Sequence, residues 1–250
     1  MAEGPSMTAA GVVSAQQTPL FHQLSAAQLR EVLQAAQPRK APRDSFLFQQ
    51  GDPAAAIYLL LAGRMRIHQV TPDGQQVLLR VLIPGEMFGG VTLLKDALYP
   101  ASARAVEECT VLGWEVETMA RLMEQYPRLA LNALRLLAAR METLQDSYRE
   151  LATERVERRV ARALLRLTRQ TGRRVEGGVL IDFPLSREDL AEMTGATLYT
   201  VSRILSGWER QGLIESGRQR VLIRRPHGLV AIAEDLPPSP PAKQPGQGAG

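Results

Sequence analysis

The chain has 250 residues, of which 45% are hydrophobic and 22% are charged, a composition that excludes disorder throughout the chain. The longest apolar run, residues 54–62, is about half of what a membrane-spanning helix needs, and the N-terminus lacks a secretory signal, so we expect a cytoplasmic protein without membrane contact. The single cysteine, Cys109, excludes an internal disulfide and an iron–sulfur or all-cysteine zinc site built from one chain.

Positive charge is concentrated in one part of the chain. Residues 155–225 hold 15 arginines against 8 acidic residues, a local charge of +7, whereas the whole chain carries +4. Such a stretch favours a polyanionic partner. The alternative is an arginine-rich face that only meets solvent.

The two ends of the chain are predicted to be disordered. Residues 1–18 are small and polar, and residues 236–250 are rich in proline and glycine, so neither end can form a core. Between them we expect a first domain over residues 19–126.

The first domain is predicted to be a helix followed by a small β-sandwich or barrel. Ser25 and Gln28 form a capping box for a helix over residues 25–36. Turn signals at roughly ten-residue spacing separate short β-rich runs. The expected strands are residues 57–61, 65–70, 77–83 and 110–116.

A long helix over residues 127–153 is predicted to bring two chains together. Its apolar residues recur at alternating spacings of three and four, the seam of a two-stranded coiled coil. The seam residues are Leu134, Leu137, Met141, Leu144, Tyr148 and Leu151. The alternative is a long helix that packs only on its own domain.

The last domain, residues 154–235, contains the strongest local signal. After a helix over residues 154–168 with an arginine face and a hairpin at 175–181, Ser186 and Asp189 predict the capped start of a short helix. Gly195 suits the tight turn that follows, and Thr197 caps a second helix. Its predicted inner face is Leu198, Val201, Leu205 and Trp208. This is a helix-turn-helix, and the hairpin over residues 213–223 is predicted to be its wing.

The second helix is expected to enter the major groove of DNA. Arginine can pair with guanine, so Tyr199, Ser202 and Arg203 are the candidate base readers. Hydroxyls and arginines at the helix starts and on the wing suit phosphates. The candidate backbone contacts are Ser186, Arg187, Thr197, Thr200, Arg218 and Arg220.

The order of these parts resembles the Crp/Fnr superfamily of bacterial transcription regulators, over about residues 20–234. The resemblance is most specific at Pro84-Gly85-Glu86-Met87-Phe88-Gly89 and over residues 185–214. It implies an α+β fold: a β-roll like a cyclic-nucleotide-binding domain, a dimerisation helix and a winged helix-turn-helix. It also implies a homodimer that binds palindromic promoter DNA and works with RNA polymerase.

The effector site departs from the family members that bind cyclic nucleotides. Where those members carry a glutamate for the ribose and an arginine–serine pair for the phosphate, this chain has Gly90 and Tyr99-Pro100. Because a phosphate buried without a cation is costly, we expect an effector other than cyclic AMP. The polar pair on the central helix is replaced by Leu144-Gln145. The candidate pocket residues are Gly89, Gly90, Tyr99, Pro100, Arg104 and Leu144.

Other effectors and functions stay open at this point. Cys109 is expected in the core, and His22 is the preferred haem ligand over His68 and His227, which are expected at the surface. Tyr99-Pro100 and residues 197–203 resemble the nitrogen-oxide-responsive branch, which implies nitric oxide as the signal. A cyclic-nucleotide-responsive regulator and a ligand-independent regulator controlled by its abundance are the alternatives.

A cyclic-nucleotide-gated subunit would have no use for a helix-turn-helix. The P-loop, HExxH and GxSxG motifs are absent, so we expect neither enzymatic activity nor a metal site.

Overall fold

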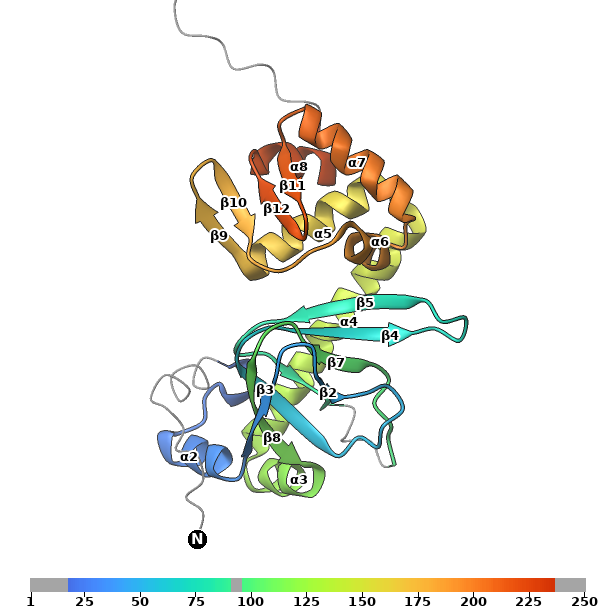
Figure 1. Cartoon of the computed structure of the whole chain (residues 1–250). Coiled ribbons are helices and arrows are strands. Elements are labelled where there is room, and N and C mark those ends of the chain that lie inside the picture. Colours follow the sequence, from blue (N-terminus) through green and yellow to red (C-terminus); the bar gives the residue numbers. More distant parts are fainter. Residues whose placement is uncertain (1–17, 91–95, 237–250) are drawn as a thin grey trace, which may run out of the picture. The chain divides into compact units, whose positions relative to one another are not determined.

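A computed structural model describes residues 18–90 and 96–236 of the chain (Figure 1). It divides into two compact units, and the division falls between Arg149 and Glu150, inside a long helix. This is four residues before the expected end of the dimerisation helix at residue 153. Within the described ranges, no helix has the length and apolar character to cross a membrane.

The predicted ends lie almost entirely outside the described residues. Of the two segments, only Thr18 and Leu236 are described, and both are ordered. Thr18 is buried and its carbonyl accepts a hydrogen bond from the amide of Phe21, while the Leu236 amide donates to the carbonyl of Ala231. The structure therefore shows order at Thr18 and Leu236, two residues that the sequence places in the disordered ends.

The first unit contains two antiparallel sheets, which confirms the predicted β-rich domain. One has the strand order β1-β8-β3-β6 and the other has the order β2-β7-β4-β5. The strands are β1 (Gln37–Ala41), β2 (Phe46–Phe48), β3 (Ala56–Ala62), β4 (Met65–Val70), β5 (Gln76–Leu82), β6 (Met87–Phe88), β7 (Ser102–Ala105) and β8 (Cys109–Glu115).

Alternation along the strands decides which side chains fill the interior of the roll. Met65 of β4 pairs with Ala105 of β7, and Ile67 pairs with Ala103, so these four small or apolar residues face inward. The residues between them on each strand face the opposite side of the sheet.

Helices pack on the outside of this roll. After a single 3-10 turn, η1 (Pro19–Phe21), α2 (Ala26–Gln34) begins at the predicted capping box of Ser25 and Gln28. α3 (Val116–Gln125) follows β8 directly, and α4 (Pro127–Thr153) follows α3. Two side-chain bonds fix these elements: Trp114 Nε1 donates to the carbonyl of Val32 at 2.7 Å, and Asn132 Nδ2 donates to the carbonyl of Leu20 at 2.9 Å.

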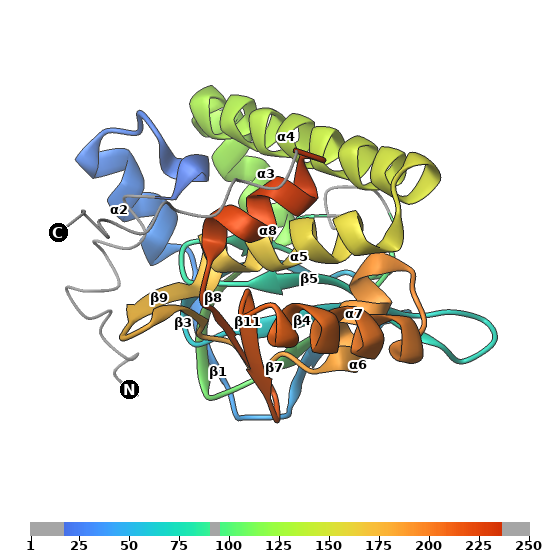
Figure 2. The same ribbon diagram turned by 90° about the horizontal axis from the view of Figure 1, so that it is seen from above.

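The second unit is a small α+β domain. Its helices are α5 (Val156–Thr171), α6 (Arg187–Thr194), α7 (Leu198–Arg210) and α8 (Pro226–Ala233). Its sheet has the order β11-β12-β10-β9, with β9 (Gly172–Val175), β10 (Gly178–Ile181), β11 (Ile214–Gly217) and β12 (Arg220–Ile223). α5 and α8 lie side by side, as both views show (Figures 1 and 2).

Candidate nucleic-acid interface and effector domain

The two helices of the helix-turn-helix begin at the predicted caps. The Ser186 hydroxyl accepts from the Asp189 amide at 3.0 Å, and the Asp189 carboxylate accepts from the Ser186 amide at 2.7 Å, so the capping box is complete. Gly195 has the left-handed φ of 59° that the tight turn requires. Thr197 then caps α7 by accepting from the Thr200 amide at 3.2 Å.

α7 presents one apolar face to the domain and one polar face to solvent. Val201, Leu205 and Trp208 are buried, as predicted, and Trp208 Nε1 donates to Glu157 at 3.0 Å. The prediction was wrong for Leu198, which is 51% exposed, because the first turn of the helix projects beyond the core. Tyr199 is 78% exposed, Arg203 is exposed and Ser202 is partly buried, so the candidate base readers lie on the outer face.

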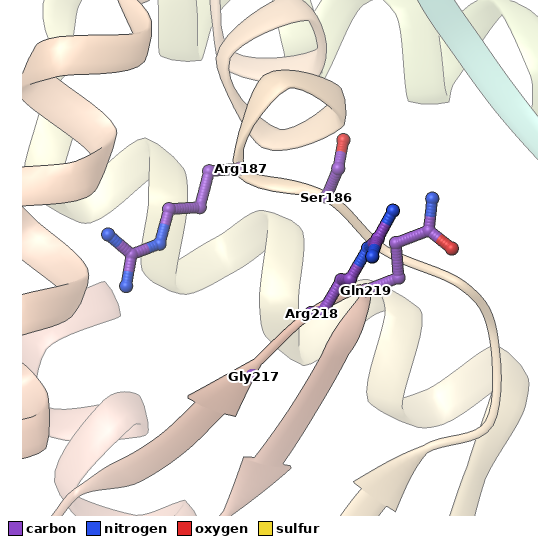
Figure 3. A pocket seen from close by; sticks show the side chains of 5 residues that line it. All are labelled: Ser186, Arg187, Gly217, Arg218 and Gln219. Atoms are coloured by element: carbon purple, nitrogen blue, oxygen red, sulfur yellow. The ribbon is translucent and has the colours of Figure 1, made fainter.

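The start of α6 and the turn of the wing enclose an open pocket. Figure 3 shows Ser186 and Arg187 on one side of it and Gly217, Arg218 and Gln219 on the other. Three of the candidate backbone contacts, Ser186, Arg187 and Arg218, thus come together, although α6, α7 and β11 separate them in the sequence. Arg187 is held in place because its Nη2 donates to the Ser216 hydroxyl at 3.3 Å.

The exposed arginines of α7 and the wing turn differ from the two that follow the wing. Arg203, Arg218 and Arg220 are exposed and have no ion-pair partner among residues 18–90 and 96–236. Arg224 pairs with Glu215, and Arg225 donates to the carbonyl of Gln211 at 3.0 Å. The local positive charge is therefore open to a polyanion at α7 and the wing.

Most of the arginine face of α5 is not open to solvent or to phosphates. Arg158, Arg159, Arg162 and Arg166 bond to carboxylates and carbonyls of their own unit, whereas Arg155 is exposed. Sequence reasoning missed this because some of the partners, such as Thr194 and Ala233, are distant in the chain.

Tyr99, a candidate pocket residue, is part of the core of the roll. It is 3% exposed, its ring stacks on Phe48 with centroids 3.8 Å apart, and its hydroxyl donates to the Ala56 carbonyl at 2.7 Å. The Ala56 amide in turn donates to the same hydroxyl at 3.1 Å. Gly89 lies beside this group, since a Cβ there would be 2.9 Å from the Ala56 carbonyl oxygen.

The other candidate pocket residues are not gathered around Tyr99. Arg104 lies on the outer face of its sheet, where it pairs with Asp44 at 3.2 Å and stacks over Phe46. Pro100 is exposed and accepts a hydrogen bond from Gln69, and Leu144 is exposed on α4. Gly90 has open space where a side chain would be. Within residues 18–90 and 96–236 of the single chain, the predicted set is therefore not gathered around one pocket.

Cys109 and the histidines occupy separate places. Cys109 is buried in the core as predicted, and burial raises the pKa of its thiol. His68 is half-buried beside Phe46, and burial together with Arg104 lowers its pKa, so the strand face is less open than expected. His22 and His227 are exposed.

The predicted seam of α4 is an exposed apolar stripe in the single chain. All six of its residues are at least half exposed, from 51% for Leu151 to 75% for Tyr148. Exposed apolar stripes of this size mark surfaces that associate.

A capped helix-turn-helix with an exposed arginine and a basic wing, joined to a β-roll, defines a DNA-binding regulator. Residues 38–126 match the model of a cyclic nucleotide-binding domain, and residues 158–232 match the Crp-like helix-turn-helix domain. The chain belongs to the Crp/Fnr family of transcription regulators, whose members are not enzymes and typically act as dimers. This confirms the predicted α+β fold class.

Named relatives span most of the chain. The "Cyclic AMP receptor protein" of Thermus thermophilus is 34% identical over 88% of this chain and 98% of its own. The "CRP-like cAMP-activated global transcriptional regulator" of Mycobacterium tuberculosis is 26% identical over 82% of this chain and 91% of its own. A CRP-family transcriptional regulator from Thermus thermophilus has a similar structure, with a TM-score of 0.67 and 29% identity over 79% of this chain and 97% of that one.

Proposed function

We propose that this regulator binds palindromic promoter DNA as a homodimer and acts there with RNA polymerase. The observation that carries the proposal is the pair Tyr199 and Arg203, exposed on the capped helix α7 beside the unpaired wing arginines. Half-sites about one helical turn apart would match the two-fold axis of a dimer.

Removing a base-reading side chain is expected to change sequence preference, whereas removing a backbone contact is expected to change overall affinity and its salt dependence. Arg203→Ala should cost roughly 1–3 kcal/mol per half-site and relax the preference at one base pair, because a bidentate contact to guanine is lost. Arg218→Ala should weaken binding to all sequences alike and reduce the salt slope by about one unit. Site selection and salt titration of both variants measure these effects.

Arg173→Ala is the matched control for these two variants. Arg173 is an exposed arginine on β9, outside the helix-turn-helix and the wing, so its loss should leave base preference unchanged. If Arg203→Ala keeps the wild-type preference at every position, the base reader is assigned to the wrong residue.

We propose further that the effector is not cyclic AMP, although the names of two relatives refer to it. A cyclic phosphate needs a cation, and the place of the family's arginine is taken by Tyr99, whose hydroxyl is bonded to Ala56. Arg104 is paired with Asp44 on the outer face of its sheet and offers no substitute.

Cyclic AMP at millimolar concentration is expected to leave the melting temperature and the DNA affinity unchanged. A ligand that binds only the folded state adds about 2.7 kcal/mol of stability at one hundred times its dissociation constant, which a melting curve detects. The Thermus thermophilus relative is the positive control. A clear rise in the melting temperature of this protein would refute the proposal.

Nitric oxide is the signal that we propose to test next. The proposal is supported by the resemblance of Tyr99-Pro100 and residues 197–203 to the nitrogen-oxide-responsive branch. For a haem cofactor the candidate ligand remains His22, whose side chain is exposed while its backbone carbonyl accepts from Asn132; His68 lies on β4 and His227 on α8. DNA binding with and without nitric oxide, together with the visible spectrum after addition of haem, tests the signal and its cofactor separately. An unchanged affinity would favour control by abundance.

A further inference from the structure

Arg159 of α5 bonds both to the end of the long helix α4 and to the turn that precedes α7. Arg159 Nη1 donates to the carbonyl of Glu154 at 2.9 Å, and its Nε donates to the carbonyl of Thr194 at 2.9 Å. Its Nη2 reaches the carbonyl of Gly195 at 3.5 Å. A single planar guanidinium thus contacts three backbone oxygens in two separate segments.

Each of the two segments has a defined position in the fold. Glu154 lies at the break between α4 and α5. Thr194 and Gly195 end α6 and form the turn before Thr197, the cap of α7. The donors on Arg159 therefore set the distance between the end of the long helix and the turn that orients α7.

A second contact joins the same two places. A Cβ at Gly195 would lie 3.0 Å from Leu151 Cδ2, so the turn packs against the last turn of α4. Position 195 favours glycine for two reasons, its left-handed φ and this close approach of Leu151.

Ion pairs hold the last turn of α4 on the same unit. Glu150 is 8% exposed and accepts from Arg166 Nη1 at 2.9 Å, with Arg162 at 3.5 Å. Glu154 pairs with Arg158 at 2.7 Å. Because Glu150 is buried and both carboxylates pair within residues 150–236, these ion pairs tie the last turn of α4 to the DNA-binding unit.

We propose that Arg159 is a positioning residue that passes any displacement of the last turn of α4 to the start of α7. The proposal rests on the proposed base reading by α7. Arg159 is not one of the candidate DNA contacts, and its three nitrogens each donate to a backbone oxygen of the same unit. It acts on specificity by fixing the angle at which α7 begins.

The test compares Arg159→Lys with Arg155→Lys in the full-length protein. Both keep the charge, but lysine has one donor nitrogen in place of the three separated nitrogens with which the planar guanidinium of Arg159 reaches its carbonyls. Arg155 is exposed at the N-cap of α5 with no capping bond from its side chain. Arg159→Lys is expected to lower the affinity for the selected site about tenfold, with the affinity for random DNA and the salt slope unchanged. Arg155→Lys should change neither. An equal fall on both DNAs would overturn the proposal.

Hydrogen exchange separates positioning from support of the whole fold. In Arg159→Lys, faster exchange is expected at residues 194–200 and not in the wing strands β11 and β12. Faster exchange throughout the unit would mean that Arg159 only stabilises the fold, which would overturn the proposal even if the variant melts early. If the wild type selects no DNA site at all, the proposed function fails instead.

A double-mutant cycle tests the connection to α4. Glu150→Gln releases the last turn of α4 from Arg166, and no direct bond joins Glu150 to Arg159 among the described contacts. If both residues act in series, the combined loss of specific affinity is expected to be smaller than the product of the single losses. Independent losses, which multiply, would contradict a shared path.

Discussion

Leu137→Asp is expected to convert the protein to a monomer and to remove most of its affinity for a palindromic site. Leu137 is 58% exposed in the single chain, so aspartate there costs the monomer little. In a dimer built on the predicted seam the same carboxylate would be buried without a partner, once in each chain, at a cost of several kcal/mol. Sedimentation at micromolar concentration measures the association, and a retardation assay measures the DNA affinity. Leu144→Asp should have the same effect.

Thr143→Asp provides the matched control. It places the same charge on the same helix at an exposed position outside the seam. It should leave both the dimer and the DNA affinity close to those of the wild type. A wild-type protein that sediments as a monomer and still binds DNA with full affinity would contradict the seam.

The helix-turn-helix could be predicted from sequence because its signals are local. The caps at Ser186 and Thr197 and the left-handed turn at Gly195 each act over three or four residues, and the structure confirms all of them. Even here the predicted inner face of α7 wrongly included Leu198, because the exposure of that residue depends on how far the core extends.

The features that sequence did not predict depend on contacts between distant segments. The arginines of α5 look like a polyanion surface until Glu150, Thr194 and Ala233 are placed beside them. In the same way, α3 follows β8 without an intervening turn and α8 has only 8 residues, so neither forms a distinct helical pattern in the sequence. Local pattern thus locates the DNA-reading element, and tertiary contacts decide what positions it.

In the effector domain, too, the sequence predicts the position of a residue but not its tertiary contacts. Sequence indicates that Tyr99 stands where related proteins have a phosphate-binding arginine. It does not indicate that Tyr99 has a packing role, because the stack on Phe48 depends on the pairing of β2 with β7, two strands that are distant in the sequence. Tyr99 is thereby part of the core of the roll.

Tyr99→Ala is accordingly expected to destabilise the first unit by about 3–5 kcal/mol, the range for removal of a buried aromatic ring. Trp114 lies in this unit and Trp208 in the other, so fluorescence of Trp114 in a Trp208→Phe background follows the unfolding of the first unit alone. Phe46→Ala, at a ring that is 44% exposed, is the control and should cost clearly less.

The hydroxyl of Tyr99 gives this packing a pH dependence that can be tested. Burial raises its pKa from the ordinary value of 10.0 to about 12, so the neutral phenol stabilises the folded state. Because the folded pKa is the higher one, this stabilisation is complete below pH 10.0 and is lost as the pH rises toward about 12. Tyr99→Phe cannot ionise and should lose less stability over that interval, although it is less stable at neutral pH because the Ala56 amide loses its acceptor. Equal losses for wild type and Tyr99→Phe over this interval would show that the buried hydroxyl does not control the stability of the roll.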